Sequence, residues 1–499
     1  MRRRNNEVRC RPFEVEDFTR TVREASSAIS EDPEIEQVAY LGRYLERLGA
    51  RTLVIESHYV DRHFVEEFSL YYARCLTPPS SVCHRLHFFS RDVSDEELDQ
   101  ELRRAAESIE LKAEVERALS HDYLGFIVVR PLAHVPVGRT ILRPLEDQAE
   151  RHIFTTTRNT VHLLGLELTL TGLAFQQQDR AVGACATAAL WMALSRVARL
   201  EGARAPTPAF ITEAASRRSL AEGRPLPSRG LTHGQVMDAI RESGFAPELL
   251  RATGNPQAFL AMLHCYLRSG IPVLLIVEED SWNEVHAVTA VGYRVGPPRP
   301  ELQFEPIRSM SMYIEQLYVH DDRLGPYARA SLEVRETELY LHIERDAGEQ
   351  EGALLVRFAI VPVYPKLRCS AEDVWPMATR FKELVQDVTE EPQTSCETFF
   401  VRAGDYLDEL VRLRAVHDIQ LPEKHWSQFM RQAAFSRWIC VARWWSEDKR
   451  PLADFIYDTT DVVRFPERVD SLLLGMVAFD ERLRSSLHLL GRNWGTPVV

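Results

Sequence analysis

A short, strongly apolar segment constrains the fold of this chain more than any other feature of its sequence. Residues 184–200 read ACATAALWMALSRVARL, and alanine-rich segments favour a helix that packs closely on its neighbours. The continuous apolar stretch covers only 184–194, which is too short to cross a membrane. We therefore expect a helix buried in a globular core, and we expect no membrane span in the chain.

The elements expected around this helix indicate an α+β domain. A strand with alternating apolar residues is expected within 161–175. Thr232 and Gln235 form a capping box, which predicts the start of a second helix ending at Gly244. Further strands are expected at 271–279, within 281–294, and at 313–322, 338–344 and 353–365. Because helices precede a run of strands, we expect a mainly antiparallel sheet with the apolar helix packed on it.

The length of the chain predicts several domains. Its 499 residues correspond to two to four domains of ordinary size. We predict an N-terminal α/β region of unknown role at 1–150, the domain with the apolar helix at 151–365, and a C-terminal α/β region at 366–499. Within the two flanking regions we expect helices at 32–48, 94–118, 371–388 and 423–435, and strands at 51–57, 125–131, 437–445 and 454–460.

Charge and cysteine content disfavour several classes of protein. Lys and Arg total 60 against 73 Asp and Glu, and the resulting net charge of −13 disfavours a dedicated nucleic-acid binder. The N-terminal segment is basic but lacks the apolar stretch of a secretory signal. The eight cysteines are scattered and do not resemble a disulfide framework in a chain of this size. We therefore expect a reducing, cytoplasmic location.

Cys185 is the candidate nucleophile. It opens the apolar helix directly after a polar loop, and the first turn of a helix carries free N–H groups and a partial positive charge that stabilise a thiolate. Gly183, two residues earlier, lets the chain turn tightly at this point. The competing interpretation is a structural cysteine, since free cysteine is among the most buried residue types.

His286 is the candidate partner of this thiolate. It opens the expected strand HAVTAVGYR directly after a polar turn, so a rigid element can aim its ring at the helix start. Asp321 is expected to orient the ring through the Nδ1 atom. We favour Asp321 over Asp322 because strand alternation puts Asp321 on the same face as Val319.

An oxyanion hole needs an amide donor beside the N–H group of the nucleophile itself. Gln176, Gln177 and Gln178 lie just upstream of Cys185 in the same loop. We favour Gln178 as this donor, with Gln177 next.

These residues, in this order, resemble the papain-like cysteine peptidase superfamily. The string Gly183-Ala184-Cys185 fits the G-[SA]-C core of the papain-type signature, and His286 opens an H-x-V-x-x-x-G-Y strand. Over about residues 165–365, the chain looks most similar to bacterial peptidases that resemble the bacteriocin leader-processing family. In that family a glutamine lies six residues before the cysteine, whereas this chain has Asp179 at that position.

The resemblance implies a bacterial thiol hydrolase that cleaves peptide or isopeptide bonds in a protein or peptide substrate. It implies a triad of Cys185, His286 and Asp321, with Gln178 in the oxyanion hole and neither a cofactor nor a metal. The flanking regions are expected to regulate the enzyme or to bind a regulatory protein partner. The alternatives are a papain-like acyltransferase, transglutaminase or deamidase, and an inactive papain-like interaction module.

A zinc site is a weaker interpretation of another cluster. Cys75, Cys83, His84 and His87 have a spacing that is not a standard ligand pattern, so we favour a structural role for them.

Overall fold

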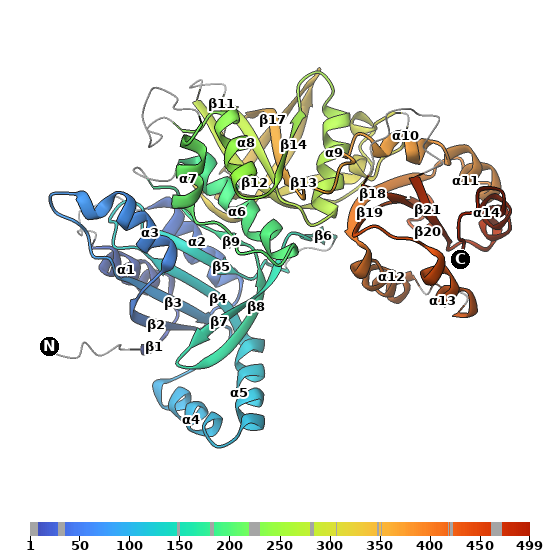
Figure 1. Ribbon diagram of the computed structural model, residues 1–499. Coiled ribbons are helices and arrows are strands. Elements are labelled where there is room, and N and C mark those ends of the chain that lie inside the picture. Colours follow the sequence, from blue (N-terminus) through green and yellow to red (C-terminus); the bar gives the residue numbers. More distant parts are fainter. Residues whose placement is uncertain are drawn as a thin grey trace.

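The computed structural model describes residues 8–27, 35–146, 150–179, 184–218, 230–279, 284–305, 307–346, 349–350, 352–417, 419, 423–460 and 472–499. They form three lobes in chain order, and the N-terminal and C-terminal lobes lie on opposite sides of the middle one (Figure 1). Each lobe combines helices with a sheet of antiparallel strands, which confirms the predicted α+β class.

The N-terminal lobe is built on a six-stranded sheet with the order β1-β2-β3-β4-β5-β9. Its strands are β1 (Val8–Pro12), β2 (Thr52–Tyr59), β3 (Cys83–Phe89), β4 (Tyr123–Val129), β5 (Val137–Leu142) and β9 (Ala174–Phe175). Its helices are α1 (Val15–Ser26), α2 (Glu36–Arg47), α3 (Arg62–Leu70), α4 (Asp95–Ala105) and α5 (Ile109–Asp122). A separate hairpin of β7 (Thr157–Leu163) and β8 (Leu166–Gly172) packs on α5.

The segment 94–118, expected as one helical stretch, contains a break between α4 and α5. Ser94 and Glu97 form a capping box at the start of α4. The side chain of Ser108 accepts a hydrogen bond from the N–H of Leu111 at the start of α5. A second N-cap therefore starts a new helix within the charged run.

The middle lobe is built on a nine-stranded sheet that closes on itself. Strand β17 (Leu354–Val363) pairs with both β11 (Val273–Glu279) and β15 (Glu338–Asp346). Between them run β12 (Glu284–Val295), β13 (Ile314–Asp321) and β14 (Gly325–Arg335), so these six strands form an antiparallel barrel. Three further strands extend the sheet: β6 (Arg151–His152), β10 (Ala246–Arg251) and β16 (Glu349–Gln350).

The predicted apolar helix is α6 (Cys185–Leu200), and it packs against β12 of the barrel. The hydroxyl of Thr289 on β12 donates a hydrogen bond to the carbonyl of Ala189 at 2.9 Å, which ties helix and strand together. The predicted capping box of Thr232 and Gln235 is also present. The other helices of this lobe are α7 (Pro208–Ser216), α8 (His233–Glu242) and α9 (Pro256–Arg268). Within the described ranges, no helix combines the length and the apolar character needed to cross a bilayer.

The first two lobes share strands across the predicted boundary at residue 150. Strand β9 follows that boundary but pairs with β5 of the N-terminal sheet, while β6 pairs with β12 of the barrel. The chain therefore passes from β6 back to the N-terminal sheet before it reaches α6. The boundaries 1–150, 151–365 and 366–499 stay predictions.

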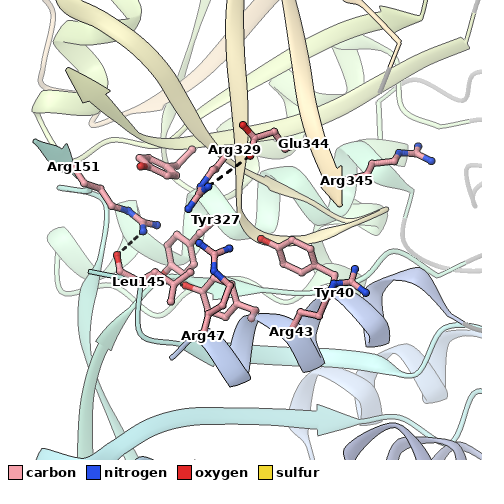
Figure 2. A pocket seen from close by; sticks show the side chains of 11 residues that line it. Tyr40, Arg43, Arg47, Leu145, Arg151, Tyr327, Arg329, Glu344 and Arg345 are labelled. Carbon is pink, nitrogen blue, oxygen red and sulfur yellow. Dashed lines mark hydrogen bonds and ion pairs between the residues drawn. The ribbon is translucent and has the colours of Figure 1, made fainter. Parts of the chain in front are cut away.

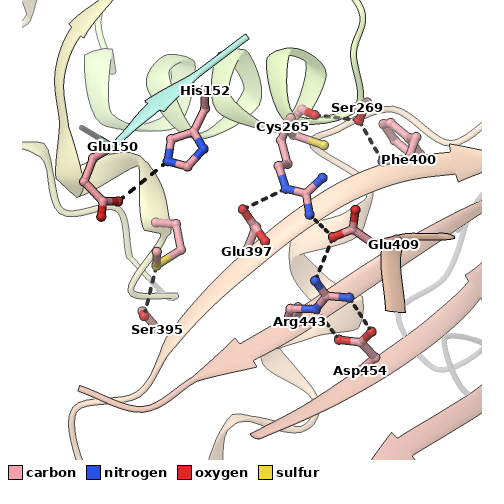
Figure 3. Close-up of polar contacts among 12 residues, drawn as sticks. Glu150, His152, Cys265, Ser269, Ser395, Glu397, Phe400, Glu409, Arg443 and Asp454 are labelled. Atoms are coloured by element: carbon pink, nitrogen blue, oxygen red, sulfur yellow. Dashed lines mark hydrogen bonds and ion pairs between the residues drawn. The ribbon is translucent and has the colours of Figure 1, made fainter. Parts of the chain in front are cut away.

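The C-terminal lobe is a four-stranded sheet with helices around it. Its strands are β18 (Ser395–Arg402), β19 (Trp438–Trp445), β20 (Pro451–Asp458) and β21 (Leu473–Ala478). Its helices are α10 (Val374–Thr379), α11 (Lys382–Thr389), α12 (Ala403–His417), α13 (Glu423–Gln432) and α14 (Glu481–Trp494). The lobe joins the middle one where β18 meets α9, and there the Phe400 N–H donates to the Ser269 hydroxyl at 2.7 Å (Figure 3).

Candidate active site

Cys185 is the first residue of α6, and its side chain is half-buried. The N-cap residue, Ala184, makes no side-chain capping bond, and the first turn of the helix contains no acidic residue. No capping side chain or carboxylate of the first turn therefore competes for the positive end of this helix, which favours an anion such as a thiolate. Gly183, predicted to form the tight turn, lies outside the described residues.

His286 lies near the start of β12, opposite Val277 on β11, and its side chain is buried. Its Nε2 atom lies 2.8 Å from Oδ1 of Asp321, which ends the neighbouring strand β13. The hydrogen bond between Thr289 and Ala189 fixes the strand that carries the histidine against the helix that carries Cys185. The structure thus holds the candidate base and acid on rigid elements packed against the candidate nucleophile.

The expectation that the acid would hold Nδ1 is wrong, because Asp321 binds Nε2. Asp321 reaches the ring from an adjacent strand, so it meets the ring nitrogen that lies farther from the histidine backbone. Nδ1 is buried and makes no hydrogen bond of standard geometry within the described chain. The Cys185 side chain nevertheless acts on this ring and helps to raise its pKa. We infer that Nδ1 is the nitrogen that faces the thiol.

The electrostatics of this group favour a charged imidazolium. Burial alone lowers the pKa of His286, but the charge and hydrogen bond of Asp321 outweigh it. Cys185 and Asp322 act in the same direction, and together they hold the pKa of His286 well above its usual 6.5. For Asp321 itself, burial raises the pKa, but the positive ring brings it below its usual range. The histidine and Asp321 therefore form an ion pair at neutral pH.

A second buried carboxylate lies beside this pair. Oδ1 of Asp322 is 3.7 Å from Nε2 of His286, and within the described chain neither oxygen of this carboxylate has a hydrogen-bond partner. Burial raises the pKa of Asp322 to about 6, although the charge of His286 opposes this. Asp322 therefore loses its proton as the pH rises through about 6, and a second negative charge then faces the ring.

The two acids are expected to differ in their effect on Cys185. Asp321→Asn removes the charge bound to Nε2, so the rate of Cys185 alkylation at about pH 6 is expected to fall roughly tenfold or more. Asp322→Asn is expected to change this rate less than about tenfold and to remove the part of its pH dependence near 6. The measurement is the alkylation rate from about pH 5 to 8 for both variants. If the Asp322 variant is the more damaged one, Asp322 is the acid that holds the ring.

The three candidate oxyanion glutamines have different surroundings. Nε2 of Gln176 donates to Oε1 of the buried Glu67 at 2.8 Å. Oε1 of Gln177 accepts the N–H of Val137 at 3.1 Å, and that side chain is also buried. Gln178 is half-buried and its side-chain amide makes no hydrogen bond within the described chain. Of the three, only Gln176 is shown to use its amide N–H group, so Gln178 and Gln177 both stay candidate oxyanion donors.

The loop before Cys185 is anchored to the N-terminal lobe. Asp179, which occupies the position where the family has its glutamine, accepts a hydrogen bond from the Tyr72 hydroxyl at 2.8 Å. Burial raises the pKa of the nearby Glu67 to about 7, although the charge of Arg130 lowers it. Tyr72 and Glu67, which bind Asp179 and Gln176 of this loop, both come from the segment around α3, far away in sequence. No local pattern around Glu67 or Tyr72 could have indicated that they support this loop.

The side chains of His286, Asp321 and Asp322 are also a candidate metal site. Within the described residues, the only group of three or more potential ligands that converge is His286, Asp321 and Asp322, with ligand atoms within 4.8 Å of one another. Imidazole with two carboxylates suits a divalent transition metal. In the structure, Nε2 of His286 bonds instead to Oδ1 of Asp321, so a metal ion would have to replace this contact.

The cluster considered for zinc in the N-terminal lobe is not brought together. Among the described residues, Cys75, Cys83, His84 and His87 form no convergent ligand group. Nδ1 of His87 instead lies 2.8 Å from the hydroxyl of Tyr123 in the core of the lobe.

The chain was compared with known proteins. No model of a known protein family matches it, and no curated protein matches it either. The functional assignment therefore depends on the chemistry and geometry of the residues described above.

Proposed function

We propose that this protein is a papain-like cysteine peptidase that acts through Cys185, His286 and Asp321. One observation carries the proposal: a buried imidazole, bound at Nε2 by a carboxylate, interacts with a cysteine at the start of a buried helix. An activated thiol of this kind needs a base and a group that orients the base. Cys185, His286 and Asp321 come from three separate elements, α6, β12 and β13, which favours a built site over a chance contact.

In the proposed mechanism the Cys185 thiolate attacks the carbonyl carbon of a peptide or isopeptide bond. The N–H of Cys185 and the amide of Gln178 stabilise the oxyanion of the tetrahedral intermediate. The His286 imidazolium then donates its proton to the leaving amine, and a thioester forms on Cys185. Water, activated by the neutral His286, hydrolyses the thioester and regenerates the thiol. Asp321 holds the ring in place throughout both steps.

The setting we propose is a reducing cytoplasm, with a protein or peptide as substrate. All eight cysteines are free thiols, which supports a compartment where disulfides do not form. The contacts of Asp179 with the N-terminal lobe support a regulatory role for that lobe, because they act on the loop directly before the nucleophile.

The reaction class is tested with a mixture of peptides and an unfolded protein, incubated in isotopically labelled water with and without a primary amine. A peptidase creates new carboxyl termini that contain oxygen from the water. A transferase joins the amine to the acyl group, and a deamidase converts glutamine to glutamate without chain cleavage. If none of these products forms, the proposal fails and an inactive interaction module is favoured.

A further inference from the structure

The carboxylate of Asp321 is oriented by the turn that follows it. Asp321 ends β13, and residues 322–324 connect it to β14. The backbone N–H of Arg323 donates to Oδ1 of Asp321 at 2.9 Å, and the same oxygen lies 2.8 Å from Nε2 of His286. The position of this oxygen beside the ring therefore depends on the direction of one backbone N–H group.

Helix α2 of the N-terminal lobe holds the other end of the same peptide group. The side-chain amide of Gln37 on α2 donates to the backbone carbonyl of Asp322 at 3.1 Å. This carbonyl and the N–H of Arg323 belong to one peptide group, which is planar, so the two cannot turn independently. The Gln37 amide therefore helps to fix the direction of the N–H group that binds Asp321.

A second contact of α2 holds the strand after the turn. Tyr40 lies three residues after Gln37, so both side chains are on one face of the helix. The Tyr40 hydroxyl donates to the carbonyl of Pro326 at 2.8 Å. A Cβ atom at Gly325 would lie 2.1 Å from the Tyr40 ring, so the absence of a side chain there lets the helix come this close. In Figure 2, Tyr40 and the other drawn side chains of α2 face those of the barrel strands.

The helix that makes these contacts is itself fixed in the N-terminal lobe. Val38, Leu41 and Leu45 on α2 are buried in the core. The Tyr44 hydroxyl donates to the carbonyl of Arg143 at 2.9 Å. Gln37 and Tyr40 therefore project from a rigid support, which is what precise positioning of another group requires.

We propose that Gln37 is a positioning residue of the active site, which acts on Asp321 through the peptide group that follows Asp322. Without the Gln37 amide this peptide group can rotate, and its N–H then leaves the carboxylate of Asp321. The carboxylate in turn holds the ring of His286 less well, and the ring supports the thiolate less well. The N-terminal lobe thereby takes part in activating the nucleophile. This inference rests on the proposed function, because it needs the pair of histidine and cysteine.

Gln37→Met keeps the length of the side chain and removes its N–H donor, so this variant of the full-length protein is the test. The matched control is Gln257→Met on α9, because the Gln257 amide also donates to a backbone carbonyl, that of Glu301, at 2.9 Å. We expect Gln37→Met to slow Cys185 alkylation at about pH 7 roughly threefold or more, and the control to label as wild type does. Thermal unfolding of each variant verifies that the fold is retained.

The spectroscopic signature of positioning is the NMR resonance of the proton between Nε2 of His286 and Oδ1 of Asp321. A charge-assisted hydrogen bond of this kind gives a resonance at low field, and His286→Ala identifies it by its loss. We expect the resonance to move to higher field in Gln37→Met and to stay in place in Gln257→Met. A loss of stability alone would not move it, because the resonance reports on the folded protein.

Three results would overturn the positioning role. If Cys185 reacts fast in the wild type while Gln37→Met keeps either the wild-type rate or the wild-type resonance, the positioning role fails and the proposed peptidase site stands. Equal slowing in Gln37→Met and Gln257→Met also overturns it, because the effect is then not specific to the turn. If Cys185 is inert in the wild type, the proposed function fails, and the positioning role fails with it.

Discussion

Replacing His286 with alanine is expected to slow the alkylation of Cys185 by about a hundredfold or more at pH near 6. In the wild type the raised pKa of His286 keeps the ring charged at this pH, and a positive charge beside the sulfur favours the reactive thiolate. The alanine variant loses that charge and leaves only the start of α6 to stabilise the thiolate. The measurement is the rate of iodoacetamide labelling, assigned to single cysteines by mass spectrometry.

The other cysteines provide the internal comparison for this experiment. Burial raises the pKa of Cys10 and of Cys265 to about 12 and that of Cys83 beyond its usual range. Cys369, Cys396 and Cys440 are also buried, and burial raises the pKa of each of these thiols. Cys75 is the remaining half-buried thiol, so Cys75→Ser is the matched control and is expected to leave Cys185 labelling unchanged.

The difference in Cys185 labelling between wild type and the alanine variant depends on pH, and its direction follows from the raised pKa of His286. The ion pair of His286 with Asp321 contributes stability in full below the usual histidine pKa of 6.5. This contribution is lost only as the pH rises through the raised pKa of the folded state. Wild-type labelling should therefore begin at lower pH than labelling of the alanine variant. If Cys185 is inert in the wild type, or labels equally in both proteins, the peptidase proposal fails.

Part of the candidate site could be predicted from sequence because its signals are local. The apolar run and the polar loop locate Cys185 at the start of a helix, and the capping box locates α8. Strand alternation favours Asp321, which the structure indeed places closest to the ring.

The rest of the site depends on contacts between distant segments. The choice of Nε2 over Nδ1 follows from the pairing of β12 with β13, which no local pattern specifies. Gln176 is buried and its amide donates to Glu67 on α3, a contact that no local pattern around Gln176 indicates.

A buried ion network at the junction of the middle and C-terminal lobes is the basis of the largest expected effect on stability. Arg443 on β19 makes two hydrogen bonds of 2.8 Å to the carboxylate of Asp454 and one of 2.9 Å to Glu409 (Figure 3). Glu409 also pairs with Arg268 at the end of α9. Burial alone would raise the pKa of Glu409, but the two arginines hold it down to about 2. This contribution to stability is present above the usual carboxyl pKa of 4.5 and is lost as the pH falls toward 2.

Arg443→Leu is expected to lower the free energy of unfolding by about 3–5 kcal/mol, because it leaves the fully buried carboxylate of Asp454 without its counter-charge. The matched control, Arg241→Leu on α8, removes an exposed ion pair with Asp238 and is expected to cost about 1 kcal/mol or less. The measurement is urea unfolding followed by tryptophan fluorescence, which reports on Trp438, Trp444 and Trp445 of β19.

The double variant Arg443→Leu with Asp454→Leu separates the loss of a contact from the cost of an isolated charge. Replacing both partners removes the buried charge that Arg443→Leu leaves behind, so the double variant is expected to be more stable than the single one. The hydroxyl of Tyr406, which donates to Asp454 at 2.8 Å, loses its acceptor and limits the recovery. If the double variant is the less stable of the two, packing by these long side chains stabilises the junction more than their charges do.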